Sequence, residues 1–287
     1  MDIKGTLKGK LNAEELKCLP RAFEVVGNIA ILEIPEELEG RKETIAEAVF
    51  AVQKNVKVVV NKIGEVEGVF RVPKVEILAS KPRSFEGIPK KFIPKALTET
   101  VHHESGARYK IDVSKAYFSA RLSGERERIA SQVKSGEKIL CLFAGVGPFA
   151  ILPARKKKVK VIAVEINQDA VKYMLENIEM NKVADKVQAI EGDVAQVLPG
   201  LKGKFDRIIM PAPKNAADFL ELALSKAKKG TIIHLYTFAP VEEIKTLGEK
   251  IKARCFAAKK KVEILDVRKA GEIGPYNYRV SVEIKIE

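Results

Sequence analysis

One stretch of the chain, from Ile139 to Phe149, changes from an apolar strand pattern to a glycine turn and then to the start of an apolar helix. Gly145 and Gly147 form the turn, and Pro148 suits the first turn of a helix. Glycines at the carboxyl end of a strand let the backbone come close to a ligand. A second apolar run, residues 159–164, follows and ends in Glu165. This order of strand, glycine turn, helix, strand and acid is typical of nucleoside-binding α/β units.

Acidic or proline residues end the next strand patterns as well. The two glycines alone would fit a tight packing turn, but a carboxylate at Glu165 can accept both hydroxyls of a ribose. The run 187–191 leads to Asp193, which can accept a hydrogen bond from an adenine amino group. The run 205–210 ends at Pro211, in a rigid loop that offers carbonyl groups without matching N–H groups. A simple strand terminator would also explain these prolines.

An adenosyl ligand without phosphates fits these strand ends better than a nucleotide. The sequence contains no Gly-x-x-x-x-Gly-Lys-Ser/Thr run, which would grip phosphates. S-adenosylmethionine is the common ligand of this kind, and we expect it as the cofactor. The candidate cofactor-binding residues are Tyr117, Phe143, Ala144, Gly145, Val146, Gly147, Glu165, Ile166, Asp193, Val194, Pro211 and Pro213.

Composition points to a polyanionic partner. The formal net charge is +13, from 51 Lys and Arg against 38 Asp and Glu, and nucleic acid is the leading candidate. A highly charged thermophile surface is the alternative explanation. The three cysteines are far apart, so we expect neither a metal site nor a disulfide framework. No run approaches the roughly 18 apolar residues that span a bilayer, and a cytoplasmic location is expected.

The pattern along the chain predicts a small α+β domain over residues 1–80, a basic loop over 81–97 and an α/β domain over 98–287. In the first domain we expect a hairpin around Gly27, a helix over 42–53 and strands at 56–60, 69–72 and 75–78. The loop carries an aromatic residue, Phe92, among lysines, as a nucleic-acid contact would. Strand–helix alternation ending in two strands predicts a Rossmann-like mixed sheet of seven strands with an antiparallel edge.

The segment just before the first strand of that sheet carries Tyr117, Arg121 and Glu125. Arg121 and Glu125 are four residues apart and would share one face of a helix. An ordinary ion pair is one interpretation. The functional one is a base that removes a proton from a ring nitrogen, beside a cation that holds a carbonyl oxygen as negative charge develops.

Three blocks resemble the archaeal and eukaryotic tRNA (guanine37-N1)-methyltransferase family, namely residues 117–126, 143–149 and 210–214. The resemblance implies that Glu125 is the general base on guanine N1 and that Arg71 assists at guanine O6. It implies that Tyr117 and Arg121 lie near the methyl donor and the target base. The family often has an Asn in the loop of Pro211, where a backbone carbonyl would substitute here. The partner implied is tRNA, through its anticodon stem-loop.

Two other functions stay open. Aminocarboxypropyl transferases of the wybutosine pathway share the fold and cofactor, but Arg121-Leu122 and the Pro211-x-Pro213 loop favour methyl transfer. A non-enzymatic RNA-binding module on the same fold would bind RNA without forming a product. The oligomeric state is also open, with a monomer allowed.

Overall fold

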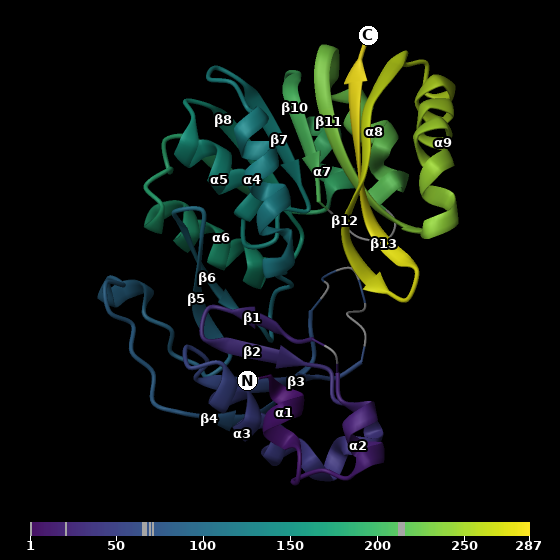
Figure 1. Cartoon of the computed structure of the whole chain (residues 1–287). Coiled ribbons are helices and arrows are strands. Elements are labelled where there is room, and N and C mark those ends of the chain that lie inside the picture. Colours follow the sequence, from purple (N-terminus) through teal and green to yellow (C-terminus); the bar gives the residue numbers. More distant parts are fainter. Residues whose placement is uncertain (1, 21, 65–67, 69, 71, 212–215) are drawn as a thin grey trace. The chain divides into compact units, whose positions relative to one another are not determined.

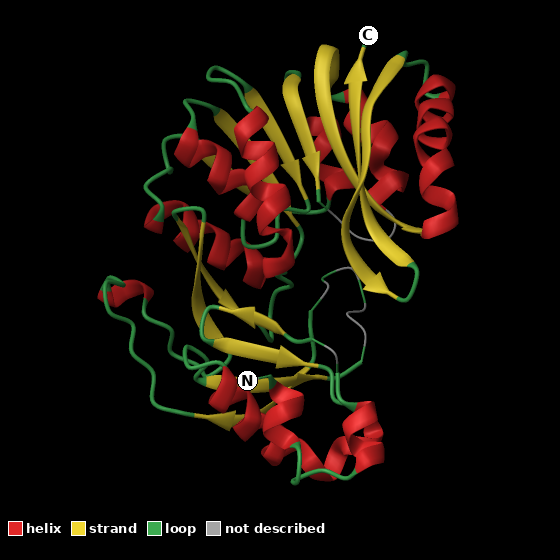
Figure 2. Ribbon diagram, viewed as in Figure 1, coloured by secondary structure: helices red, strands yellow, loops and turns green. Residues whose placement is uncertain are grey.

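The computed structural model describes residues 2–20, 22–64, 68, 70, 72–211 and 216–287 (Figures 1 and 2). The chain divides into two compact units, Met1–Ala120 and Arg121–Glu287. The sequence placed the start of the α/β domain at residue 98, whereas the compact units divide after Ala120.

The first unit is a small α+β structure with its own core. Its described strands form a four-stranded sheet in the order β1-β2-β3-β4, with β2 and β3 parallel and the other pairs antiparallel. Helix α3 packs against this sheet, and its buried face includes Ile45 and Val49. The elements are α1 (Ile3–Leu7), α2 (Ala13–Cys18), β1 (Glu24–Val26), β2 (Ile29–Leu32), η1 (Glu36–Arg41), α3 (Lys42–Val52), β3 (Val58–Lys62), β4 (Val75–Ser80), η2 (Lys90–Phe92), β5 (Glu99–Glu104) and β6 (Ala107–Asp112).

The β5–β6 hairpin lies in this unit because its side chains accept hydrogen bonds from the turn between β1 and β2. The backbone N–H of Gly27 donates to Nδ1 of His102 at 3.1 Å, and that of Asn28 donates to Oγ1 of Thr100 at 3.1 Å. A Cβ on Gly27 would lie only 2.2 Å from the same Thr100 oxygen, so the turn needs glycine. Contacts of this kind between distant segments explain why the compact unit extends to Ala120.

The structure of this unit differs from two local expectations. Phe70 lies in a turn and Val72 in irregular structure, so the strand expected over 69–72 is wrong at these positions, while Val69 and Arg71 lie outside the described residues. Phe92 is only 4% exposed, with Nζ of Lys91 4.9 Å from its ring centroid. A side chain with so little exposed surface is not available to stack on a nucleic-acid base, so Phe92 has a structural role.

The second unit confirms the predicted α/β fold. In the described part of the chain its sheet has seven strands in the order β12-β13-β11-β10-β7-β8-β9. Strands β11, β10, β7, β8 and β9 are parallel, each to the next in this order. Strand β13 is antiparallel to both of its neighbours, β11 and β12. The elements are η3 (Ala120–Leu122), α4 (Ser123–Gln132), β7 (Lys138–Leu142), α5 (Pro148–Lys156), β8 (Lys160–Glu165), α6 (Gln168–Met180), β9 (Val187–Glu191), α7 (Val194–Gly200), β10 (Phe205–Met210), η4 (Ala216–Phe219), α8 (Leu220–Ser225), β11 (Ala227–Pro240), η5 (Val241–Glu243), α9 (Ile244–Ala257), β12 (Val262–Gly274) and β13 (Asn277–Ile286).

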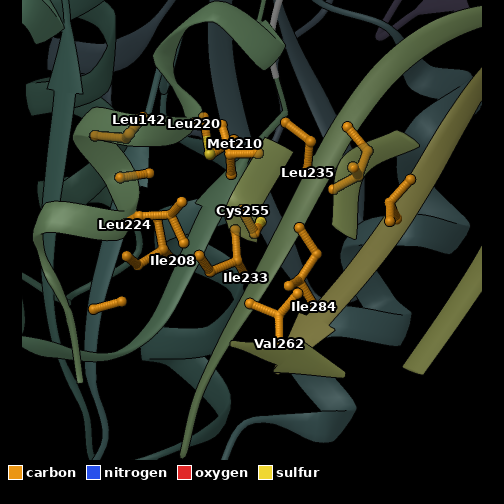
Figure 3. Close-up of a cluster of buried hydrophobic side chains, with 14 of the residues drawn as sticks. Leu142, Ile208, Met210, Leu220, Leu224, Ile233, Leu235, Cys255, Val262 and Ile284 are labelled. Atoms are coloured by element: carbon orange, nitrogen blue, oxygen red, sulfur yellow. The ribbon is translucent and has the colours of Figure 1, made fainter. Parts of the chain in front are cut away.

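The two faces of this sheet differ in chemistry. Side chains such as Leu142, Ile208 and Leu235 project from one face into a buried apolar cluster with α7, α8 and α9 (Figure 3). The opposite face lies under α4 and α5 (Figure 1) and carries polar side chains, among them His234 and Glu283. A face that buries charged groups needs partners for them. Arg128 and Gln132 of α4 donate to Glu283, whereas His234 contacts Arg207 of β10.

Gly147 is the residue before α5 and has a φ of +90°. A Cβ there would lie 2.9 Å from Cγ of Met174 and 3.0 Å from Cδ1 of Ile151. We expect Gly147→Ala to lower the free energy of unfolding by about 1–2 kcal/mol for the left-handed backbone, plus about 1–3 kcal/mol for overpacking. Urea denaturation measures this loss.

Gly136 provides the matched control, since its φ is +93° but nothing lies within 4 Å of its Cβ position. Gly136→Ala should therefore show the backbone loss alone. Equal losses in the two variants would contradict the packing role given to Gly147.

Candidate functional site

Four parallel strands of the second unit end side by side at one edge of the sheet. Leu142 of β7 is paired with Val164 of β8, and the N–H of Ala144 donates to the carbonyl of Val164 at 3.0 Å. The N–H of Gly192, after β9, donates to the carbonyl of Glu165 at 2.9 Å. Because β10 lies on the other side of β7, Pro211 also belongs to this edge. The predicted convergence of the strand ends is therefore present.

The turn after β7 is held in an unusual backbone conformation. Phe143, Gly145 and Gly147 have φ values of +53°, +56° and +90°. A positive φ at a phenylalanine is costly and persists where the surrounding structure enforces it, which is common at ligand sites. Here the carbonyl of Ala144 accepts from Gly147 N at 2.9 Å, and that of Val146 accepts from Nδ2 of Asn177 at 3.0 Å. The turn is thus fixed before any ligand arrives.

Glu165 fastens this turn to the next strand end. Its Oε2 accepts from the N–H of Gly145 at 2.7 Å, and its Oε1 accepts from the N–H of Asn167 at 2.8 Å. The side chain is largely buried, and Ile166 beside it is half-buried. A carboxylate has about four acceptor positions, so two remain for the hydroxyls of a ribose. The sequence indicated that Glu165 could accept ribose hydroxyls, but not that its carboxylate would also hold the glycine turn in place.

Asp193 has a structural role that was not predicted from the sequence. It is the N-cap of α7, and its Oδ1 accepts from the N–H of Ala195 at 2.8 Å. Val194 is buried in the apolar cluster, which fixes the start of this helix. The half-buried Asp193 carboxylate retains its second oxygen as an acceptor at the strand edge.

The end of β10 completes the edge. Pro211 directly follows Met210 and is half-buried, whereas Ala212 and Pro213 lie outside the described residues. The rings of Phe143 and Phe219 meet edge to face with centroids 5.1 Å apart. The glycine turn is therefore packed against η4, the segment that follows the proline loop.

Glu125 lies on α4 and is clamped by two donors. Oε1 accepts from Nε of Arg128 at 3.0 Å, while Oε2 accepts from Nη2 of Arg128 at 2.8 Å and from the hydroxyl of Tyr236 at 2.5 Å. Burial acts to raise the pKa of the Glu125 carboxyl, but these hydrogen bonds and nearby positive charge outweigh it and lower the pKa. Glu125 is therefore a shielded but ionised carboxylate at neutral pH.

The geometry around Glu125 differs from the expected helical pair with Arg121. Helix α4 begins at Ser123, so the exposed Arg121 lies in the preceding 3-10 turn and not on the same helical face. Arg128, three residues after Glu125, takes the place of that cation. The spacing of Glu125 and Arg128 could have suggested this pair, whereas no local pattern relates Glu125 to Tyr236.

Glu125 lies at the level of the strand ends. Leu235 of β11 is paired with Met210 of β10, so Tyr236 comes level with Pro211. The Tyr236 ring packs on Phe149 of α5 at 5.7 Å between centroids. A proton acceptor and the glycine turn are thus joined within one unit through Tyr236 and α5.

Tyr117 and Arg71 are the remaining candidate residues. Tyr117 is half-buried and belongs to the first unit, and Arg71 lies outside the described residues. Their predicted roles stay predictions.

In the described ranges no three His, Cys, Asp or Glu side chains are grouped as a metal site would require. Nor does any helix in that part of the chain combine the length and apolar character needed to cross a membrane.

Comparison with known proteins places the chain among tRNA-modifying enzymes. Residues 100–265 match the TRM5/TYW2 methyltransferase domain, and residues 3–82 match the TYW2 N-terminal domain. A tRNA (guanine(37)-N(1))-methyltransferase Trm5b from Pyrococcus abyssi is 39% identical, over 93% of this chain and 76% of the relative. A tRNA(Phe) (4-demethylwyosine(37)-C(7)) aminocarboxypropyltransferase from Pyrococcus horikoshii is 36% identical, over 83% of this chain and 79% of the relative.

A solved structure agrees with these matches. The complex of aTrm5 with tRNALeu superposes with a TM-score of 0.82 at 32% identity, covering 100% of this chain and 78% of the other. The likeness therefore extends over both compact units.

Proposed function

Because the chain belongs to the TRM5/TYW2 methyltransferase family, we propose that it transfers a methyl group from S-adenosylmethionine to N1 of guanine 37, next to the anticodon of tRNA. One observation supports this most strongly. A half-buried, ionised carboxylate, Glu125, lies at the same sheet edge as the fixed glycine turn and Glu165. A proton acceptor beside a nucleoside cradle is what N-methylation of a protonated ring nitrogen requires.

The residues of the strand edge fit the cofactor. Gly145 has a positive φ and no side chain, which allows a ligand to come close to its backbone, and the Glu165 carboxylate keeps acceptor positions for ribose hydroxyls. Asp193 keeps one oxygen for the adenine amino group. S-adenosylmethionine, when bound, supplies the methyl group as a sulfonium. The absence of a phosphate-gripping loop in the sequence agrees with a ligand that has no phosphates.

Within the site, we assign the proton transfer to Glu125, which takes the proton from guanine N1. The family resemblance supports assigning Arg71 to guanine O6, and Tyr117 and Arg121 to positions near the target base and the methyl donor. The carbonyl groups of the Pro211 and Pro213 loop would orient the base, since prolines offer acceptors without N–H donors. tRNA is the partner, and a net charge of +13 suits a polyanion. With a tRNA substrate, we propose a cytoplasmic location.

Nucleoside analysis tests the proposed reaction. The protein is incubated with a tRNA transcript and S-adenosylmethionine, and the digested product is examined by mass spectrometry. We expect N1-methylguanosine from a transcript with guanine at position 37, and no product from the same transcript with adenine there. RNA binding without any modified nucleoside would instead support the RNA-binding module.

The aminocarboxypropyl relative supports a second candidate, transfer of the other sulfonium substituent. The methyltransferase relative matches more of the chain at higher identity, which favours methyl transfer. Cofactor labelled in the methyl group and, separately, in the carboxyl group separates the two reactions. Methyl transfer puts only the first label into tRNA, and aminocarboxypropyl transfer puts in only the second.

Asp193 permits a test that separates cofactor binding from helix capping. Asp193→Asn keeps an oxygen for the N-cap but replaces the second acceptor by an NH₂ donor. We expect it to raise the Kd for S-adenosylmethionine about tenfold, measured by calorimetry, because one hydrogen bond to a charged group is lost. Asp193→Ala should weaken cofactor binding similarly and also lower stability by about 1 kcal/mol. RNA affinity should not change in either variant.

The Asp193→Asn result decides the role. If this variant binds S-adenosylmethionine as tightly as the wild type, Asp193 is a helix cap and not a cofactor ligand.

A further inference from the structure

We propose that Tyr236, together with Arg128, is a positioning residue that directs the base, so that one oxygen of Glu125, Oε1, takes the proton from the target ring nitrogen. This inference rests on the proposed function, in which Glu125 is the base on guanine N1. Neither Tyr236 nor Arg128 needs to touch the substrate for this role. Both act through the geometry of the Glu125 carboxylate.

The acceptor positions of Glu125 are unequally used. Oε2 accepts two hydrogen bonds, from the Tyr236 hydroxyl at 2.5 Å and from Nη2 of Arg128 at 2.8 Å. Oε1 accepts one, from Nε of Arg128 at 3.0 Å. Each carboxylate oxygen has about two lone-pair positions, so Oε2 is saturated and Oε1 retains one. A proton arriving from the substrate can therefore bond only to Oε1 without displacing a donor.

The resulting step balances. The N1–H bond of guanine breaks, its proton forms an O–H bond with Oε1, and the electron pair stays on N1 to form the new bond to the methyl carbon. The S–C bond of the sulfonium breaks, and its electron pair remains on sulfur. Arg128 keeps its charge throughout, because its pKa is raised by Glu125 and Glu283 despite the opposing effect of burial.

The Tyr236 hydroxyl is held in place by the rest of the fold. Tyr236 is fully buried on β11, a strand paired on both sides with β10 and β13, and its ring packs on Phe149. Burial and the neighbouring carboxylate raise the pKa of Tyr236, so it remains a donor at neutral pH and does not act as a base itself. A fixed donor of this kind keeps the carboxylate from rotating.

The second donor is anchored as well. Nη1 of Arg128 donates to Oε2 of Glu283 at 2.9 Å, and Nη2 donates to Oγ of Ser281 at 3.2 Å. Both partners lie on β13, and Nε2 of Gln132 also donates to Glu283 at 3.1 Å. The groups around Glu125 that can carry charge are thus Arg128 on α4, Arg268 on β12 and, behind Arg128, Glu283 on β13, together with the neutral hydroxyl of Tyr236 on β11.

Tyr236→Phe tests this role, because it removes the hydroxyl and keeps the ring. Loss of a donor to the ionised carboxylate raises the pKa of Glu125, so the acidic limb of the kcat–pH profile should move to higher pH. We expect kcat at pH 7 to fall about tenfold, with the KM values for tRNA and cofactor unchanged. Tyr278→Phe, on the adjacent strand β13, is the matched control and should leave kcat and the profile unchanged.

A titration without substrate gives an independent measurement. In protein labelled with ¹³C at glutamate carboxyl carbons, the Glu125 signal is identified by its absence in Glu125→Gln. Its midpoint should lie at higher pH in Tyr236→Phe than in the wild type. Arg128→Lys keeps the charge but loses the contact through two nitrogens. Like Tyr236→Phe, it should raise the midpoint and lower kcat.

The outcomes separate this inference from the proposed function. If the wild type forms no N1-methylguanosine, both are overturned. If the wild type is active but Tyr236→Phe and Arg128→Lys keep its kcat, pH profile and carboxyl midpoint, only the directing role is overturned. An equal shift in Tyr278→Phe would overturn it too, because the effect would then not depend on contact with Glu125.

Discussion

Glu125→Gln is expected to lower kcat by about 10²–10⁴-fold, the usual contribution of a positioned general base. The amide keeps the shape of the side chain but cannot take a proton from guanine N1. Affinity for tRNA and for S-adenosylmethionine should stay close to that of the wild type, since binding does not need the proton acceptor. Single-turnover methylation with saturating tRNA and cofactor measures this loss in the chemical step.

Glu127→Gln is the control for this prediction. Glu127 lies on the same helix, two residues on, and forms an ion pair with Lys156 on α5 instead of facing Tyr236. Its replacement should leave kcat unchanged. Wild-type kcat at neutral pH in Glu125→Gln would show that Glu125 is not the base.

Glu165→Gln is expected to raise the Kd for S-adenosylmethionine by about 10²-fold or more. Two charge-assisted hydrogen bonds to ribose hydroxyls are lost, each contributing about 1.5–3 kcal/mol. The amide also turns an NH₂ group toward the backbone N–H of either Gly145 or Asn167, where the carboxylate accepted from both. Calorimetric titration measures the affinity, and urea denaturation measures the loss of stability from the loosened turn.

Glu191 serves as the comparison. It is paired with Glu165 in the register of β8 and β9, but its side chain is exposed. Glu191→Gln should bind S-adenosylmethionine as the wild type does. Unchanged affinity in Glu165→Gln would exclude Glu165 from the ribose site.

Local patterns in the sequence were sufficient for the core of the fold. The strand, glycine turn and helix around Gly145 occur where the residues predicted them. These elements are encoded by neighbouring residues, through apolar periodicity and glycine at positive φ. The mixed sheet with its antiparallel edge followed from the alternation of such elements.

Contacts between distant segments could not be predicted in this way. The hairpin of β5 and β6 belongs to the first compact unit because Thr100 and His102 bind the turn at Gly27, far earlier in the chain. Phe92 lies among lysines in the sequence yet is only 4% exposed. In both cases tertiary packing decides what composition leaves open.

The candidate site shows the same division. The acids at the strand ends were visible, but the bond from Glu165 to Gly145 and the cap formed by Asp193 were not. The partners of Glu125 come from the next turn of α4 and from β11, so the expected pair with Arg121 was replaced by Arg128 and Tyr236. A spacing rule for helices cannot identify a partner on a strand.

A crystal structure of the protein with S-adenosylmethionine tests the central claim most directly. We predict the adenosyl group at the turn of Gly145, with both ribose hydroxyls on the Glu165 carboxylate and the adenine amino group at Asp193. Side chains closing that edge, or cofactor bound at another place on the second unit, would contradict the proposed site.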